Sequence, residues 1–135
     1  MKLTEQHVID TLRQVGDKWL TPKYKHEWEP NSPTNGYCYI VAEVLFHYVV
    51  DNSTPICISF EDGTTHWYVK SKDTGVITDY TRQQFGDERI PYERGVGRGF
   101  MKGGVQTPKG YISKRGHELA LLLGVVPEET LLMAG

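Results

Sequence analysis

The chain has 135 residues, a formal net charge of −2, and 39% hydrophobic and 24% charged residues. This length predicts one domain, residues 1–135, and the composition is ordinary for a globular protein. The small negative charge gives no reason to expect nucleic acid or an anionic membrane as a partner. The first residues lack a signal-peptide core and no apolar run is long enough to cross a bilayer, so we expect a cytoplasmic protein.

The first part of the chain contains two predicted helices. Apolar residues recur at helical spacing over 5–15, between the N-cap Thr4 and the stop signal Gly16. Residues 17–37 are irregular and rich in aromatic residues, which predicts a strap packed on the domain. The next helix, over 38–49, is apolar nearly all round, so we expect it to be the buried central helix.

Three strands are expected next, at about 55–60, 66–70 and 76–80. The segments between them contain Asp-Gly and Asp-Thr-Gly, which are typical of tight turns. These turns predict two antiparallel hairpins. Residues 81–85 are expected to form a short helical turn.

The composition changes after the strands. Residues 86–112 are rich in glycine and basic residues and predict a long loop region with at most a short strand. A helix is predicted over 114–123, capped by Ser113, and a further short helix over 127–133. The order of elements predicts a single α+β domain with a helix packed on a small antiparallel sheet.

Cys38 is the most informative residue, because it stands at the start of the central helix. Unpaired amides and the helix dipole at that position stabilise a thiolate. His66 and Asp79 follow on two predicted strands. A cysteine, a histidine and an aspartate in these settings outline a cysteine hydrolase, in which Cys38 attacks, His66 transfers the proton and Asp79 orients His66. Cys57 lies inside a predicted buried strand and is interpreted as a core residue.

The pairing of the second and third strands decides whether Asp79 faces His66. A register in which paired residue numbers sum to 145 places the two residues opposite each other. A register of 146 turns Asp79 to the other face of the sheet, because side chains alternate along a strand. The sequence is compatible with both registers.

Other residues complete the predicted site. The backbone amide of Cys38 is the first expected oxyanion donor, and the side-chain amides of Asn31 and Asn35 are further candidates. Asn35 equally suits a turn or a helix cap. Tyr37 and Trp67 are the predicted walls of the pocket.

Simpler interpretations apply to several residues. We expect Glu43 on an exposed helix face, and ordinary surface or capped positions for the remaining histidines, which are His7, His26, His47 and His117. Cys38, His66 and Asp79 plus water could describe a catalytic zinc site. Neither a His-Glu-x-x-His motif nor a cysteine pair supports zinc, so no cofactor is predicted. The segment 86–112 is expected to be a solvated loop, or a lid or substrate-binding rim above the cysteine.

Three segments carry a resemblance to a known family: Gly36-Tyr-Cys38, His66-Trp-Tyr68 and Asp79-Tyr-Thr-Arg-Gln-Gln-Phe85. Over about residues 30–86 the chain resembles the papain-like cysteine hydrolases, and it is most similar to small bacterial and phage-type proteins of the YunG-like group. The resemblance implies a papain-like fold with Cys38, His66 and Asp79 as the triad. It implies no particular substrate.

The leading hypothesis is a cysteine hydrolase or acyltransferase that acts on an amide, isopeptide or thioester carbonyl of a protein or peptide. The alternative is a catalytically inactive papain-like domain that binds or inhibits a host protein, as a phage or mobile-element effector does. A third hypothesis is deamidation or crosslinking by transglutaminase-like chemistry with the same three residues. The sequence assigns neither the substrate nor the oligomeric state.

Overall fold

The computed structural model describes residues 3–127, which form an α+β fold with a small antiparallel sheet. The α-helices are α1 (Glu5–Val15), α2 (Pro22–Glu27), α3 (Cys38–Val44) and α4 (Lys114–Leu123). The strands are β1 (Ser53–Ser59), β2 (Thr65–Ser71), β3 (Ile77–Thr78), β4 (Val96–Gly97), β5 (Val105–Thr107) and β6 (Gly110–Ile112). The helix predicted over 127–133 lies almost wholly outside the described residues.

Helices α1 and α4 have the predicted bounds because their ends are capped locally. The Thr4 hydroxyl accepts from the His7 amide, and the Ser113 hydroxyl accepts from the Gly116 amide. Helix α2 lies inside the predicted irregular strap. Its six residues include no buried side chain, so it carries no apolar periodicity that the sequence could reveal.

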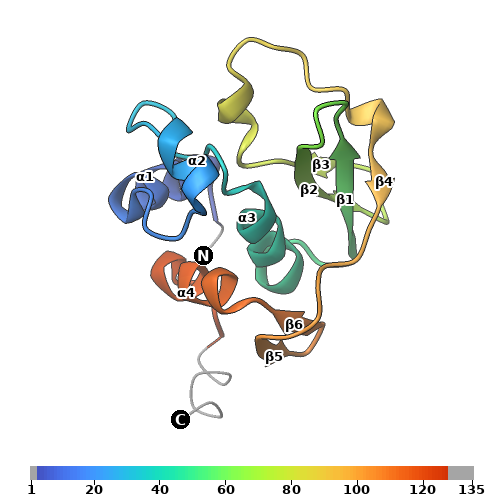
Figure 1. Cartoon of the computed structure of the whole chain (residues 1–135). Helices are drawn as coiled ribbons and strands as arrows, with labels where there is room; N and C mark the ends of the chain where they lie inside the picture. Colours follow the sequence, from blue (N-terminus) through green and yellow to red (C-terminus); the bar gives the residue numbers. More distant parts are fainter. Residues whose placement is uncertain (1–2, 128–135) are drawn as a thin grey trace.

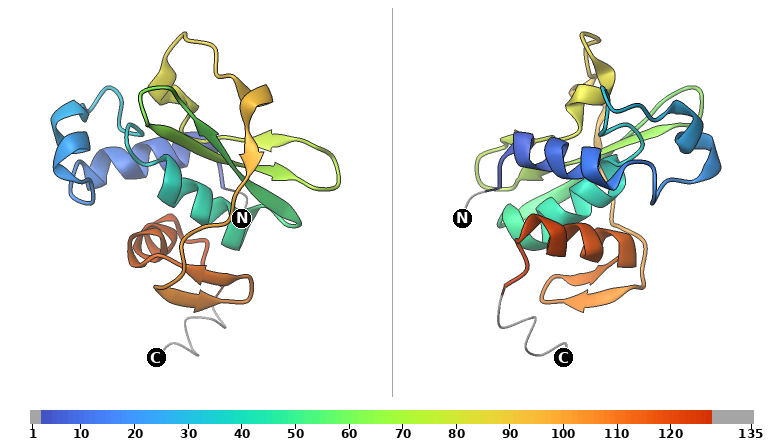
Figure 2. Two further views of the ribbon diagram at one scale, coloured as in Figure 1. Left: turned by 45° about the vertical axis from the view of Figure 1, so that its right-hand side comes forward. Right: turned by 90° about the vertical axis from the view of Figure 1, so that its left-hand side faces the viewer.

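Helix α3 is the predicted central helix, and it packs between β2 and α4 (Figures 1 and 2). The chain continues beyond Val44 as a π-helical turn, Leu45–Val49. The main core surrounds this unit and includes Val8, Leu12, Val41, Leu45, Ile112 and Leu119.

Two polar residues of this unit are buried, contrary to the sequence-based expectation. Glu43 is 0% exposed, because its carboxylate accepts hydrogen bonds from the Ser113 amide at 2.9 Å and hydroxyl at 2.6 Å. His47 is 6% exposed, and its Nδ1 lies 2.7 Å from the Thr107 hydroxyl. Both side chains face elements that lie more than 50 residues later in the chain, which periodicity does not reveal.

The main sheet has the strand order β3-β2-β1-β4, and each neighbouring pair is antiparallel. Both predicted hairpins are present. Cys57 of β1 pairs with Trp67 of β2, and these side chains belong to a cluster that includes Cys38 of α3. The opposite face carries Ile58 and Tyr68. Ile90 and Tyr92, which come after β3 in the chain, pack against that face.

The segment 86–112 contains three short strands, more regular structure than the predicted long loop region with at most one short strand. It contains a 3₁₀ turn, Tyr92–Arg94, then β4, which pairs with β1, then the β5-β6 hairpin that lies apart from the main sheet (Figure 1). Phe100 stacks on Trp67 with ring centroids 5.5 Å apart. Short strands rich in glycine give a weak sequence signal, which explains the error.

Within residues 3–127, no helix has the length and apolar character that crossing a membrane requires.

Candidate active site

Cys38 is the first residue of α3. Tyr37 precedes it as the N-cap residue and supplies no side-chain cap for the first turn. Gly36 permits this tight entry, because its φ is +85° and an added Cβ would lie 2.9 Å from Leu20. The Cys38 side chain is 9% exposed, and its sulfur lies 3.8 Å from the carbonyl oxygen of Thr65.

His66 and Asp79 form a buried pair, with Nε2 of the histidine 2.6 Å from Oδ2 of the aspartate. The pairing of Val69 with Thr78 gives a register of 147, which differs from both alternatives considered from the sequence. The sum 147 is odd, as is 145, and a shift of two residues leaves each side chain on the same face. Asp79 therefore lies on the face of the sheet that carries His66. The two residues are diagonal neighbours, within reach of their side chains.

The carboxylate of Asp79 accepts hydrogen bonds at both oxygens. Oδ2 accepts from the Tyr92 hydroxyl at 2.7 Å as well as contacting His66. Oδ1 accepts from the Thr81 amide at 3.2 Å and from the Thr81 hydroxyl at 3.3 Å. These donors fix the orientation of the carboxylate relative to the imidazole ring.

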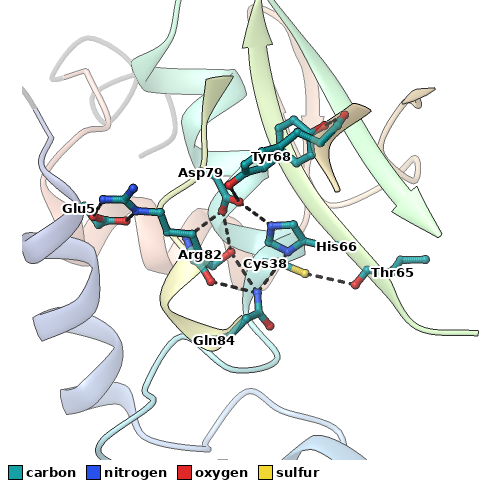
Figure 3. A network of polar contacts seen from close by, with 10 residues as sticks. Glu5, Cys38, Thr65, His66, Tyr68, Asp79, Arg82 and Gln84 are labelled. Atoms are coloured by element: carbon teal, nitrogen blue, oxygen red, sulfur yellow. Dashed lines mark hydrogen bonds and ion pairs between the residues drawn. The ribbon is translucent and has the colours of Figure 1, made fainter. Parts of the chain in front are cut away.

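Figure 3 shows the Cys38 sulfur beside the edge of the His66 ring that points away from Asp79. His66 is 1% exposed. Burial lowers the pKa of His66, but hydrogen bonds and negative charge from Asp79 and Cys38 outweigh it and raise the pKa to about 9. The contacts with Asp79 and Cys38 therefore favour the cationic form of the imidazole despite its burial.

Gln84 is a site residue that the sequence reasoning left without a role. Its Nε2 lies 3.2 Å from His66 Nδ1 and donates to the carbonyl oxygen of Thr81 at 3.1 Å. Gln84 belongs to the 3₁₀ turn Arg82–Phe85, directly after Asp79. The available signal was its place in the Asp79–Phe85 segment that carried the family resemblance.

A cavity of about 290 Å³ opens beside the cysteine. Its lining includes Cys38, Tyr39, Thr65, Trp67, Gln84, Met101 and Arg115. Met101 brings the segment 86–112 to this cavity, where a rim residue was expected. A second cavity of about 330 Å³ shares Tyr24, Thr65 and Gln84 with the first. The two hollows therefore adjoin at Gln84 and Thr65.

Only some of the predicted pocket residues lie at the cavity. Trp67 lines the cavity that contains Cys38, as expected. Tyr37 instead packs in the main core, and its hydroxyl donates to the Gly16 carbonyl at 2.6 Å, so it does not wall this pocket. Asn31 is exposed in the strap. The amide of Asn35 donates to the Glu27 carbonyl at 3.3 Å, which is the role of a turn residue.

The arrangement does not suit a metal ion. Asp79 contacts Nε2 of His66, and Cys38 lies at the other edge of the ring, so the three side chains do not converge on one point. In the described part of the chain, no group of three or more His, Cys, Asp or Glu side chains could hold a metal ion. The zinc alternative therefore finds no support in this geometry.

A comparison with family models supports the resemblance to the YunG-like group. The model described as YunG protein matches residues 4–123, which is most of the chain. The chain belongs to the YunG protein family. No curated protein and no solved structure matches the chain. The YunG match includes Cys38, His66, Asp79 and Gln84, together with the segment 86–112, which the sequence-based resemblance had left out.

Proposed function

We propose that this member of the YunG family is a papain-like cysteine hydrolase or acyltransferase. One observation carries the proposal: the buried pair of His66 and Asp79, 2.6 Å apart, with the Cys38 sulfur on the other side of the imidazole. A histidine fixed by a carboxylate on one nitrogen and facing a thiol on the other is the arrangement that nucleophilic catalysis requires. Cys38 lines the adjoining cavity, which is the proposed entry for a carbonyl group.

In the proposed mechanism the Cys38 thiolate attacks the carbonyl carbon of an amide, isopeptide or thioester, and a carbon–sulfur bond forms. The bond to the leaving group breaks, and His66 gives its proton to the departing nitrogen or sulfur. The product is a thioester on Cys38. A water molecule, or an acceptor amine in an acyltransferase, then attacks this thioester while His66 takes up its proton; the carbon–sulfur bond breaks, and Cys38 leaves as the thiolate.

Two donors are available to the oxyanion. The backbone amide of Cys38 lies in the first turn of α3, where Tyr37 gives no side-chain cap. The Gln84 amide lines the same cavity as the cysteine and lies beside His66. Donors placed at the developing negative charge stabilise a tetrahedral intermediate. Gln84 is therefore the proposed side-chain donor, a role for which the sequence offered Asn31 and Asn35 as candidates.

The test uses Cys38→Ala with Cys57→Ala as the matched control. Each protein is incubated with a pooled peptide library and with isopeptide- and thioester-linked model substrates, and products are identified by mass spectrometry. Cys38→Ala should abolish turnover, by at least about 10⁴-fold, and retain the native circular dichroism spectrum. Cys57 is buried in the same cluster as Cys38 but takes no part in the proposed bond changes, so its variant should keep the activity. Activity in Cys38→Ala would end the proposal.

The burial of Cys38 favours a second candidate, a catalytically silent domain that binds or inhibits another protein. Cys38 is only 9% exposed, and its thiol is placed to donate to the Thr65 carbonyl. Alkylation of the folded protein with iodoacetamide separates the two functions. Rapid reaction of Cys38 at pH 6 supports catalysis, because an ordinary thiol with a pKa of ~8.5 is protonated there. A Cys38 that reacts no faster than Cys57 supports the binding protein.

A further inference from the structure

We propose that Tyr92 is a positioning residue for the Cys38–His66–Asp79 arrangement, and that the segment 86–97 serves to present its hydroxyl to Asp79. This inference rests on the proposed function, because it assigns Tyr92 to the same reaction. The sequence-based prediction assigned no role to Tyr92, because it lies in a stretch that was expected to be loop.

The contact between Tyr92 and Asp79 is short and specific. The hydroxyl donates to Oδ2 at 2.7 Å, and Oδ2 is also the atom that lies 2.6 Å from His66 Nε2. Burial, followed by the hydrogen bond and charge of Asp79, raises the pKa of Tyr92 above its ordinary value. The phenol therefore stays protonated and remains a donor over the working range of the site.

Ring packing, hydrogen bonds and strand pairing fix the position of Tyr92. Its ring packs edge-on against Tyr68, with centroids 5.0 Å apart, and its carbonyl accepts from the Tyr68 hydroxyl at 3.2 Å. The Gly95 amide donates to the same carbonyl at 3.0 Å. Immediately afterwards β4 pairs with β1 and anchors the segment to the sheet. Gly95 permits this approach, because an added Cβ would lie 2.6 Å from Ile56 and closer still to the Tyr68 hydroxyl.

These contacts indicate what Tyr92 does in the reaction. The Thr81 donors hold Oδ1, and Tyr92 holds Oδ2, so the carboxylate is fixed from both sides with a lone pair directed at His66. A fixed carboxylate keeps the imidazolium oriented toward the Cys38 sulfur. The titratable groups that share this environment are Cys38 from α3, His66 and Tyr68 from β2, Arg82 from the 3₁₀ turn, and Tyr92.

The experiment compares Tyr92→Phe with Tyr111→Phe, a control on an exposed tyrosine of β6. Cys38 alkylation by iodoacetamide is measured by mass spectrometry from pH 4.5 to 10. We expect Tyr92→Phe to slow alkylation about 10-fold at pH 6, which corresponds to one hydrogen bond to a charged group. The two rates should converge above about pH 9.5, where an ordinary thiol is ionised without help. Tyr111→Phe should follow the wild-type profile.

Gly95→Ala provides a second variant, which keeps the hydroxyl but displaces the turn that carries it. It should reproduce the altered pH profile of Tyr92→Phe. A purely structural role for Tyr92 would lower the melting temperature and leave the pH profile in place, and that result would overturn the inference. Failure of the proposed function gives a different result, in which wild-type Cys38 already follows the profile of an unactivated thiol. A wild-type protein that is reactive at pH 6, with no change in Tyr92→Phe, refutes the role of Tyr92 alone.

Discussion

Two regions of buried polar residues invite comparison, one at the sheet and one between α3 and the elements that follow Val105. At the sheet, His66 is paired with Asp79 and lies beside Cys38, so its partners are themselves titratable. Between α3 and α4, Glu43 is paired with the amide and hydroxyl of Ser113, which keep their protons. Burial is therefore common to both regions. What distinguishes the candidate active site is that proton-carrying groups contact one another next to a cavity.

The two buried histidines show the same difference in their pKa values. The carboxylate and the sulfur beside His66 outweigh burial and raise its pKa to about 9. His47 lies near the Thr107 hydroxyl, and its Nε2 has no hydrogen-bond partner in the described structure. Burial therefore dominates there and lowers the pKa of His47 to about 4. The partners, and not the depth of burial, decide which histidine is charged.

Among the variants that test this comparison, Asp79→Asn should have the largest effect, because it removes the carboxylate that contacts His66. The amide can donate to His66 Nε2 and so favours the tautomer with its proton at Nδ1, facing Cys38. Any turnover should fall by at least about 100-fold, and Cys38 alkylation at pH 6 should slow in parallel. Intact-protein mass spectrometry measures the alkylation. Unchanged alkylation in a folded Asp79→Asn protein would mean that Asp79 has no part in activating the cysteine.

The unfolding free energy should depend on pH through the titration of both buried histidines, His66 and His47. His66 has a raised pKa, so its contribution is complete below pH 6.5 and is lost as the pH rises toward 9. His47 has a lowered pKa, so stability is lost as the pH falls from 6.5 toward 4. Each contribution amounts to about 3 kcal/mol. Urea unfolding at a series of pH values should therefore give a maximum of the unfolding free energy near pH 6.5.

Two variants show which histidine causes the loss of stability on each side of the maximum. His66→Gln should flatten the alkaline limb, and His47→Gln should flatten the acid limb, relative to the wild-type protein. If both variants keep the wild-type curve, the titration that shapes it belongs to other groups and the contrast between the two histidines is incorrect.

The smallest effect is expected from Glu43→Gln, in the region between α3 and α4. One of the two Ser113 donors loses its acceptor and faces an amide N–H group instead, which should lower the unfolding free energy by about 2 kcal/mol. Thermal and urea unfolding measure this change. Cys38 alkylation at pH 6 should remain at the wild-type rate in the folded protein. A loss of alkylation without a loss of stability would place Glu43 in the site.

Local signals in the sequence predicted much of this fold. The caps Thr4 and Ser113 marked the starts of α1 and α4, and glycine marked their ends. Two turn sequences predicted the hairpins that bring β1, β2 and β3 together. These features depend on residues within a few positions of each other, which is why a sequence can reveal them.

Contacts between distant segments were not predicted. Glu43 was expected at the surface because its partner, Ser113, is 70 positions away in the sequence. Tyr92 was missed because its stretch of glycines and charges has no periodicity. The register of the β2-β3 hairpin, 147, is neither of the two that the sequence left open, and it places Asp79 on the same face as His66. A hairpin with a longer turn leaves the facing side unchanged when the register moves by two.

The short strands at the two edges of the main sheet have a consequence for the solubility of the chain. Both β3 and β4 contain only two residues, and they flank the seven-residue strands β1 and β2. An edge strand of this length offers few free backbone groups to a strand of a neighbouring molecule, which limits edge-to-edge aggregation. The strand that carries His66 is held along its whole length by β1, whereas β3 covers its other side only at Val69 and Lys70.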